Sequence, residues 1–193
     1  MATEKELKIV ILGDGGVGKT SLTYQFVYHY FIQKYDPCIE ESYKTTVTVD
    51  GETFRIEVFD AQEELAALRD LYMKRSDGFL IVYDITNHQT FDEIEPFREQ
   101  LMRVRDEDLL TIPVVICGNK SDLSSNRSVS TEEGAKYAKS MGFPFIETSA
   151  KTAENVDEAF FSVIRGFMSF KQNQNSDNSK ATSGKGKNKC VVC

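Results

Sequence analysis

Residues 7–20 read LKIVILGDGGVGKT, an apolar, partly β-branched run that changes into a glycine-rich segment ending in lysine and threonine. The apolar run is typical of a buried strand, and the glycines indicate that this strand ends in a loop. The segment from Gly13 to Thr20 fits the pattern G-x-x-x-x-G-K-[ST], which requires a strand before it and a helix after it. We therefore expect a strand over residues 7–12, a phosphate-binding loop, and a helix over residues 19–30.

The chemistry of a phosphate group explains the spacing of this loop. Glycines let the backbone wrap closely around the phosphate, and the loop amides and the helix N-terminus present partial positive charge to it. Lys19 can neutralise β and γ oxygens, and the Thr20 hydroxyl can bind Mg²⁺. The alternative is a flexible glycine turn. On the first interpretation, the residues that contact the nucleotide are Gly13, Asp14, Gly15, Gly16, Val17, Gly18, Lys19, Thr20 and Ser21.

The remaining patterns predict the fold class. Residues 45–50 and 53–59 alternate around Asp50-Gly51, a favoured hairpin turn, and predict one antiparallel pair. The apolar runs 79–83, 112–117 and 143–146 are continuous, as in parallel strands covered on both faces. Helices separate these runs; one is introduced by Ser130 and Glu133, which resemble a capping box, and is followed by Gly142.

These elements predict a doubly wound α/β fold. Its sheet would be mostly parallel and six-stranded, with one antiparallel edge strand and about five helices. In such a fold the ligand lies at the carboxyl ends of the strands. The loops that follow the strands carry the candidate motifs.

Composition and charge divide the chain into two parts. The 193 residues are 40% hydrophobic and 27% charged, which suits one soluble domain. Residues 171–193 hold five lysines and one aspartate, so with a net charge of −7 overall, residues 1–170 carry −11. We expect a folded domain over residues 1–170 and a disordered basic tail over residues 171–193. The acidic domain argues against nucleic acid as a partner, and the basic tail suits an anionic membrane.

The compartment is predicted to be reducing. The four cysteines, Cys38, Cys117, Cys190 and Cys193, match neither a metal-binding spacing nor a disulfide framework. The start of the chain shows no secretory signal, because its apolar stretch is too short. We therefore expect synthesis in the cytosol.

A second motif identifies the base of the nucleotide. Residues 119–122 read NKSD and directly follow a predicted strand. A carboxylate such as that of Asp122 can accept hydrogen bonds from both N1 and N2 of guanine, and adenine lacks this donor pair. Residues 147–151, ETSAK, follow the next strand at the same edge of the sheet. Each segment alone could be a solvated polar loop, but together and in this order they favour guanine.

The phosphate loop, Tyr35-Asp36-Pro37 with Ile39-Glu40, Asp60, and the two loops at residues 119–122 and 148–151 form a recognisable set. With them the chain resembles a Ras-family small GTPase over about residues 6–168 and in its tail. The resemblance implies the P-loop small GTPase fold. It also implies a switch that binds GDP or GTP with Mg²⁺ and hydrolyses GTP to GDP and phosphate. The expected partners are an exchange factor, a GTPase-activating protein and effector proteins.

The resemblance also implies roles for individual residues. Phe31 would pack against the guanine, Tyr35 would contact the nucleotide, and Asp60 would join Thr20 in binding Mg²⁺, Asp60 doing so through water. The base loop would be formed by Asn119, Lys120 and Asp122 and supported by Ser149, Ala150 and Lys151. The segment that meets effectors would comprise Tyr35, Asp36, Pro37, Cys38, Ile39, Glu40, Glu41, Ser42 and Tyr43. Its acidic pair suits basic partners, although such a pair could equally be a solvated charged loop.

The chain departs from the family pattern in two places. The family has a threonine where this chain has Cys38, and a thiol is a poor ligand for Mg²⁺. This exchange weakens the first switch unless it is a harmless substitution. The family also reads Asp-x-x-Gly-Gln-Glu where this chain reads DAQEE from Asp60, two residues fewer. Gln62 is the candidate for orienting the attacking water, and its altered spacing predicts slow hydrolysis.

The last four residues, CVVC, fit the C-a-a-X prenylation signal, with Cys190 as the acceptor. One lipid binds membranes only marginally, so Lys180, Lys185, Lys187 and Lys189 would supply the second signal. The alternative is a chance apolar ending. The signal predicts a lipid-anchored protein at the cytoplasmic face of a membrane, and we expect the plasma membrane. The choice between farnesyl and geranylgeranyl stays open.

Two functions fit this sequence. The leading hypothesis is a membrane-anchored guanine-nucleotide switch whose hydrolysis is slow without a partner. The alternative is a non-catalytic GTP-binding interaction module held in one conformation. A nucleoside kinase with a phosphate loop is disfavoured by the guanine-reading loop and by the lack of an Arg-rich lid.

Overall fold

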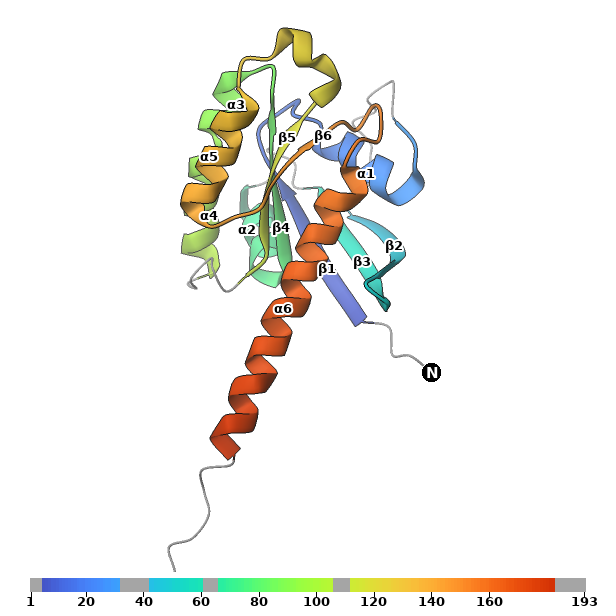
Figure 1. Ribbon diagram of the computed structural model, residues 1–193, viewed down its shortest axis with the longest axis vertical. Helices are drawn as coiled ribbons and strands as arrows, with labels where there is room; N and C mark the ends of the chain where they lie inside the picture. Colours follow the sequence, from blue (N-terminus) through green and yellow to red (C-terminus); the bar gives the residue numbers. More distant parts are fainter. Residues whose placement is uncertain (1–4, 32–41, 61–65, 106–111, 183–193) are drawn as a thin grey trace, which may run out of the picture.

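The computed structural model describes residues 5–31, 42–60, 66–105 and 112–182, which form a twisted sheet with helices on both faces (Figure 1). The sheet has six strands in the order β2-β3-β1-β4-β5-β6, and only the pair of β2 and β3 is antiparallel. The predicted doubly wound α/β fold is therefore confirmed. The strands are β1 (Lys5–Leu12), β2 (Ser42–Val49), β3 (Glu52–Asp60), β4 (Gly78–Asp84), β5 (Val114–Asn119) and β6 (Phe145–Thr148).

Six α-helices and one 3₁₀ helix lie in the described part of the chain. They are α1 (Lys19–Tyr28), α2 (Ala66–Arg75), α3 (His88–Asp92), α4 (Ile94–Arg105), η2 (Ser121–Asn126), α5 (Thr131–Met141) and α6 (Val156–Thr182). The count exceeds the predicted five because the chain separates α3 from α4 at Glu93. None of these helices is long and apolar enough to cross a lipid bilayer.

Strand β1 lies at the centre of the sheet and serves two hydrophobic cores. It pairs in parallel with β3 on one side and with β4 on the other. Its side chains alternate between the faces, so Ile9 and Ile11 pack under α1 and α6, whereas Val10 and Leu12 pack under the helices of the opposite face. This placement fixes the point where β1 ends and the glycine-rich loop begins.

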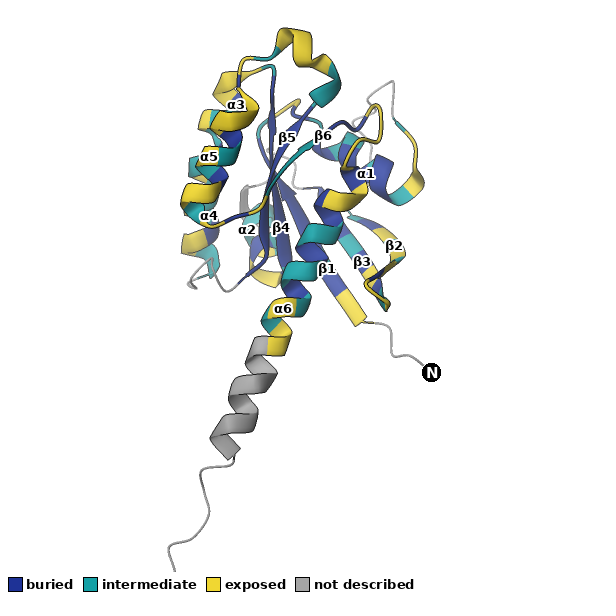
Figure 2. Cartoon of the chain, in the orientation of Figure 1, coloured by how far each residue is buried: buried dark blue, intermediate teal, exposed yellow. Residues whose placement is uncertain are grey.

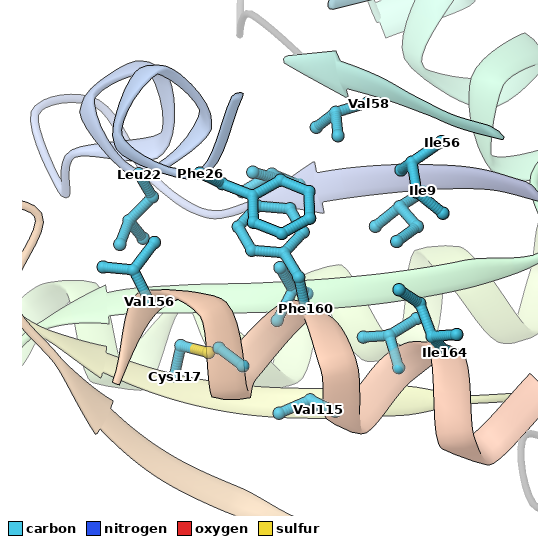
Figure 3. Packing of buried hydrophobic residues seen from close by; sticks show 14 of the residues in the cluster. Ile9, Leu22, Phe26, Ile56, Val58, Val115, Cys117, Val156, Phe160 and Ile164 are labelled. Carbon is cyan, nitrogen blue, oxygen red and sulfur yellow. The ribbon is translucent and has the colours of Figure 1, made fainter. Parts of the chain in front are cut away.

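The core beneath α1 and α6 joins the first helix to the last (Figure 3). The ring of Phe26 in α1 stacks on that of Phe160 in α6, with centroids 3.8 Å apart and planes 6° apart. Leu22, Val156 and Cys117 pack around this pair in the same cluster. The stack therefore holds α1, whose N-terminus borders the glycine-rich loop, against the rest of the domain.

Local sequence signals explain several boundaries. Asp50 and Gly51 both have positive φ values, 50° and 84°, as the two central residues of a type I′ hairpin turn require. Helix α5 is capped at its start, where the Ser130 hydroxyl accepts from the Glu133 amide at 3.1 Å, and Gly142 ends it in the left-handed region. The Glu133 carboxylate contacts His88 instead of returning to Ser130, so the predicted capping box is half formed.

Some elements begin or end away from the predicted residues. Strand β5 begins at Val114 and not at residue 112, and Pro113, which has no N–H, contributes only its carbonyl, to Phe79. Strand β6 begins at Phe145 and not at residue 143, directly after Pro144. Helix α1 ends at Tyr28 because His29 adopts the left-handed conformation.

Helix α6 continues to Thr182, past residue 170, where a disordered tail was expected. Its buried residues lie along the part that rests on the sheet (Figure 2) and end with Phe167. The Lys171 ammonium lies 4.4 Å from the Phe167 ring centroid, at the edge of this packed part. Backbone hydrogen bonds can continue an α-helix beyond its packed face, so the polar composition of this segment does not show where the helix ends.

Candidate nucleotide-binding site

The glycine-rich loop connects β1 to α1 in a conformation that requires glycine. A Cβ at Gly13, where φ is 146°, would lie 2.2 Å from the Val82 carbonyl oxygen. A Cβ at Gly18, where φ is 99°, would lie 2.5 Å from the Asn119 side-chain nitrogen. At Gly16, where φ is 72°, a Cβ would meet nothing within 4 Å. The loop therefore packs closely against β4 and β5 and is open at Gly16, the form expected of a phosphate cradle.

Lys19 supplies a positive charge inside this loop. Its ammonium donates to the carbonyl oxygens of Gly13, at 2.7 Å, and Asp14, at 2.8 Å, and the residue is only 8% exposed. The Asp14 carboxylate accepts from the Gly15 amide at 2.8 Å and so shapes the same turn. The side chain of Lys19 thus lies across the glycine-rich loop, with its charge beside the predicted position of the phosphates.

Thr20 and Asp60 form a candidate Mg²⁺ site beside the loop. The Thr20 hydroxyl donates to Oδ2 of Asp60, and Oδ1 of Asp60 is buried with no hydrogen-bond partner among the described residues. Burial raises the pKa of Asp60, although the Thr20 hydrogen bond and the nearby Lys19 charge lower it. A buried carboxylate oxygen without a partner, next to a hydroxyl, fits a hard cation.

The rest of the coordination also suits Mg²⁺. In the described ranges no group of three or more His, Cys, Asp and Glu side chains could hold a metal. Mg²⁺ does not need such a cage, since it usually binds one or two protein ligands, substrate phosphates and several waters. One hydroxyl and one carboxylate at the mouth of a phosphate loop therefore fit it.

The Asn119 side chain joins three segments that are distant in sequence. Its Nδ2 donates to the Val17 carbonyl oxygen at 2.8 Å, across 102 positions of the chain. Its Oδ1 accepts from the Thr148 hydroxyl at 3.2 Å and from the Ala150 amide at 3.3 Å. Because Asn119 is only 1% exposed, these bonds form without competition from water. The phosphate loop and both predicted base loops are thus brought together.

Asp122 and Lys120 are oriented by partners outside their own loop. The Ser149 hydroxyl donates to Oδ1 of Asp122 at 2.6 Å. The Lys120 ammonium donates to Oδ2 of Asp84, the last residue of β4, at 2.6 Å. Burial alone would raise the pKa of Asp84, but hydrogen bonds from Lys120 and Thr86 outweigh it, so that pKa lies below its ordinary value. Asp84 therefore stays ionised beside Lys120.

A pocket of about 290 Å³ lies between the phosphate loop and the base loops. Nine of its ten lining residues were predicted to contact the nucleotide. The lining comprises Gly16, Gly18, Ser21, Phe31, Asn119, Lys120, Asp122, Leu123, Ala150 and Lys151. Leu123, an exposed apolar residue, was not predicted from the sequence, although its place directly after Asp122 was a usable signal. Asp84, an acidic residue at the end of an apolar run, was not predicted either.

Several predicted residues lie outside the described ranges. They are Tyr35 to Glu41 in the expected effector segment, the candidate catalytic Gln62 and the expected lipid acceptor Cys190. The effector segment continues into the structure at Ser42 and Tyr43. Tyr43 is 1% exposed, and its ring packs edge-on against Tyr24, with centroids 5.3 Å apart. Its side chain belongs to the core because an aromatic ring at this inward-facing position of β2 packs under α1.

Comparison with known proteins agrees with this geometry. A model of the Ras family matches residues 8–169. Ras-like protein 1 of Saccharomyces cerevisiae is 49% identical over 166 residues, which are 85% of this chain and 53% of that protein. The chain thus spans about half the length of this yeast relative.

Two proteins of Dictyostelium discoideum match over most of both chains. Ras-like protein rasB is 47% identical over 167 residues, 86% of this chain and 84% of its own. Ras-like protein rasC is 48% identical over 176 residues, 90% of this chain and 92% of its own. The span matched by the family model, residues 8–169, includes the phosphate loop, both base loops, strands β2 to β6 and the part of β1 from Lys8 onward. This chain therefore belongs to the Ras family of small GTPases.

Proposed function

We propose that this protein is a membrane-anchored guanine-nucleotide switch that binds GDP and GTP with Mg²⁺ and hydrolyses GTP slowly. The observation that carries this proposal is the Asn119 side chain, which joins the phosphate loop to both base loops around one pocket. The proposed partners are an exchange factor, a GTPase-activating protein and effectors that meet residues 35–43.

The base would be recognised by Asp122. Its carboxylate is held by the Ser149 hydroxyl at the edge of the pocket and is suited to accept from N1 and N2 of guanine. Phe31 and Leu123 also line the pocket and would contact the faces of the ring. Adenine has no N1 and N2 donor pair for this carboxylate, so with adenine bound only the Ser149 hydroxyl would donate to Asp122, and the acceptor positions that face the base would stay unpaired.

Replacing Asp122 with alanine should remove the preference for guanine. We expect GDP affinity to fall about tenfold to hundredfold while ADP affinity stays low, since a hydrogen bond to a charged group contributes about 1.5–3 kcal/mol. Competition of GDP and ADP against a fluorescent nucleotide measures both affinities. Asp157→Ala, which removes an exposed carboxylate on α6, is the matched control. Equal affinity of the natural chain for GDP and ADP contradicts the guanine assignment.

The phosphates would be held by the loop amides and Lys19, and Mg²⁺ by Thr20 and Asp60. When bound, Mg²⁺ supplies positive charge to the β and γ phosphate oxygens. Lys19 would neutralise the same oxygens, and Asp60 would provide the oxygen that has no partner within the described structure. These assignments explain why a carboxylate is kept in so buried a position.

Replacing Asp60 with asparagine should abolish the stabilisation by Mg²⁺. With GDP present, the natural chain should gain about 2.7 kcal/mol at a Mg²⁺ concentration one hundred times its Kd, and Asp60→Asn should gain almost nothing. Thermal unfolding in EDTA and in MgCl₂ measures the gain. Asp77→Asn is the matched control, because Asp77 accepts only from the Lys8 amide in the described part of the chain. An undiminished gain in Asp60→Asn contradicts this role.

The free energy of unfolding should depend on pH through Asp60, and Asp60→Asn tests this. Because burial raises the pKa of Asp60, this carboxyl group keeps its proton to a higher pH in the folded protein than in the unfolded chain. The ionised carboxylate therefore opposes folding increasingly as the pH rises through the raised pKa. In EDTA, Asp60→Asn should be more stable than the natural chain near neutral pH, and this advantage should disappear in acid.

Slow hydrolysis is proposed from the segment between β3 and α2, which has five residues, 61–65. Both of its ends are anchored. The Tyr72 ring stacks on Phe59 of β3 at 4.6 Å, and Gln100 of α4 donates to the Asp70 carboxylate at 2.6 Å. Arg105 caps the end of α2 by donating to the Ser76 carbonyl oxygen at 2.8 Å. Because α2 is held to α4, it cannot easily move to compensate for the two missing residues.

Restoring the family's spacing should accelerate hydrolysis. We expect insertion of two residues after Ala61 to raise the single-turnover rate at least about tenfold, because small displacements of a water-orienting group are costly. The experiment compares the natural chain, the insertion variant and Gln62→Leu. If the natural chain is as fast as the insertion variant, and Gln62→Leu abolishes that activity, the short segment has a working geometry. Identical conformations with GDP and GTP would favour the non-catalytic module instead.

Membrane attachment is proposed from the chain end, which lies outside the described residues. Replacing Cys190 with serine should remove the lipid and shift the protein from the membrane fraction to the soluble fraction. Cys193→Ser is the matched control, because it keeps a C-a-a-X signal. The natural attachment should weaken with salt, since lysines supply the second signal. Full membrane recovery of Cys190→Ser would refute the anchor.

A further inference from the structure

We propose that Asp84 is a positioning residue that holds Lys120 of the base loop in place for the nucleotide. This inference rests on the proposed guanine-nucleotide function. Asp84 is the last residue of β4 and lies opposite Asn119 in the register of β4 and β5. It therefore lies at the carboxyl edge of the sheet, where Asn119 and Lys120 border the pocket.

The two oxygens of the Asp84 carboxylate have separate partners. Oδ1 accepts from the Thr86 amide at 2.8 Å and from the Thr86 hydroxyl at 2.7 Å. Oδ2 accepts from the Lys120 ammonium at 2.6 Å. The Asp84 amide donates to the Thr90 hydroxyl at 2.9 Å, which fixes the backbone as well. Thr86 thus orients the carboxylate so that its second oxygen points to Lys120.

Lys120 depends on such an anchor. Its backbone is left-handed, with φ 69° and ψ 37°, a conformation that is uncommon for lysine. With this backbone the ammonium reaches Oδ2 of Asp84. The side chain is 31% exposed, and a free lysine there would sample many rotamers in water. Binding the ammonium at Asp84 fixes the aliphatic stem along the pocket before the nucleotide arrives. A preorganised wall binds a ligand more tightly than one that must first be ordered.

The contact is better suited to ligand binding than to folding. Asp84 is buried, but the Lys120 side chain is 31% exposed, so water screens the ion pair from one side and ordering the lysine costs conformational freedom, which limits what the pair contributes to stability. The pair nevertheless lies beside the ligand, where the position of Lys120 matters directly. If Asp84 acts through Lys120, the effect of changing it must disappear once Lys120 has been truncated.

The test measures release of a fluorescent GDP derivative from the natural full-length chain, Asp84→Asn, Lys120→Ala and the double variant, with Mg²⁺ present. Asparagine keeps the oxygen that accepts from Thr86 but removes the charge that faces Lys120. We expect Asp84→Asn to speed release about tenfold and Lys120→Ala to speed it further. The double variant should be within about twofold of Lys120→Ala alone. Glu95→Gln, which alters a carboxylate bonded to Arg98 and Tyr137 away from the pocket, should leave release unchanged.

The outcomes separate this inference from the function on which it rests. If the natural chain binds GDP but Asp84→Asn releases it at the natural rate, the inference is wrong and the proposed function stands. If Asp84→Asn is equally harmful with and without Lys120, Asp84 does not act through Lys120 and the inference is again wrong. If the natural chain fails to bind GDP, both fall. If Asp84→Asn does not fold, Thr86→Val is the substitute, because it removes the hydroxyl that orients the Asp84 carboxylate. Thr86→Val should speed release about twofold to threefold. An unchanged release rate in that variant overturns the inference.

Discussion

The site depends on one buried amide, the side chain of Asn119. Its nitrogen is bonded to the phosphate loop and its oxygen to the loop after β6, so both ends of the amide are satisfied. Loss of this side chain would leave the Val17 carbonyl oxygen and the Ala150 amide without their partner, at a cost of about 1–3 kcal/mol for each group. The loops proposed to hold phosphate and base therefore depend on Asn119 for their relative positions.

The sheet explains why one residue can reach all three segments. Parallel strands end at a common edge, and β1, β3, β4, β5 and β6 deliver Gly13, Asp60, Asp84, Asn119 and Thr148 to that edge in turn. Close packing below the edge sets the spacing between these strands. The phosphate loop then lies against β4 and β5 so tightly that Gly13 and Gly18 have no space for a side chain. The packing of the strands therefore sets the positions of the candidate binding residues at the edge of the sheet.

Local patterns allowed much of this to be predicted from the sequence. The glycines of the phosphate loop, the Asp50-Gly51 turn and the Ser130 cap all act on neighbouring residues, so their effects can be read over a short span. Asp84 could not be assigned in this way, because its partner Lys120 lies 36 positions later and only the pairing of β4 with β5 brings them together. The burial of Tyr43 was missed for the same reason, since its ring packs on α1. The continuation of α6 to Thr182 was missed because a polar composition does not exclude a helix.

The stack of Phe26 on Phe160 has a consequence for how the protein is made. During synthesis the phosphate loop leaves the ribosome early, but the residues that complete its surroundings are translated near the end of the domain. Contacts between such distant positions form late, because a long loop must first close. A nascent chain that stops before α6 would lack Phe160 and the packing that holds α1 in place. The surroundings of the phosphate loop are therefore complete only after α6 has been translated. A nucleotide can stabilise the finished domain but cannot guide the folding of its first half.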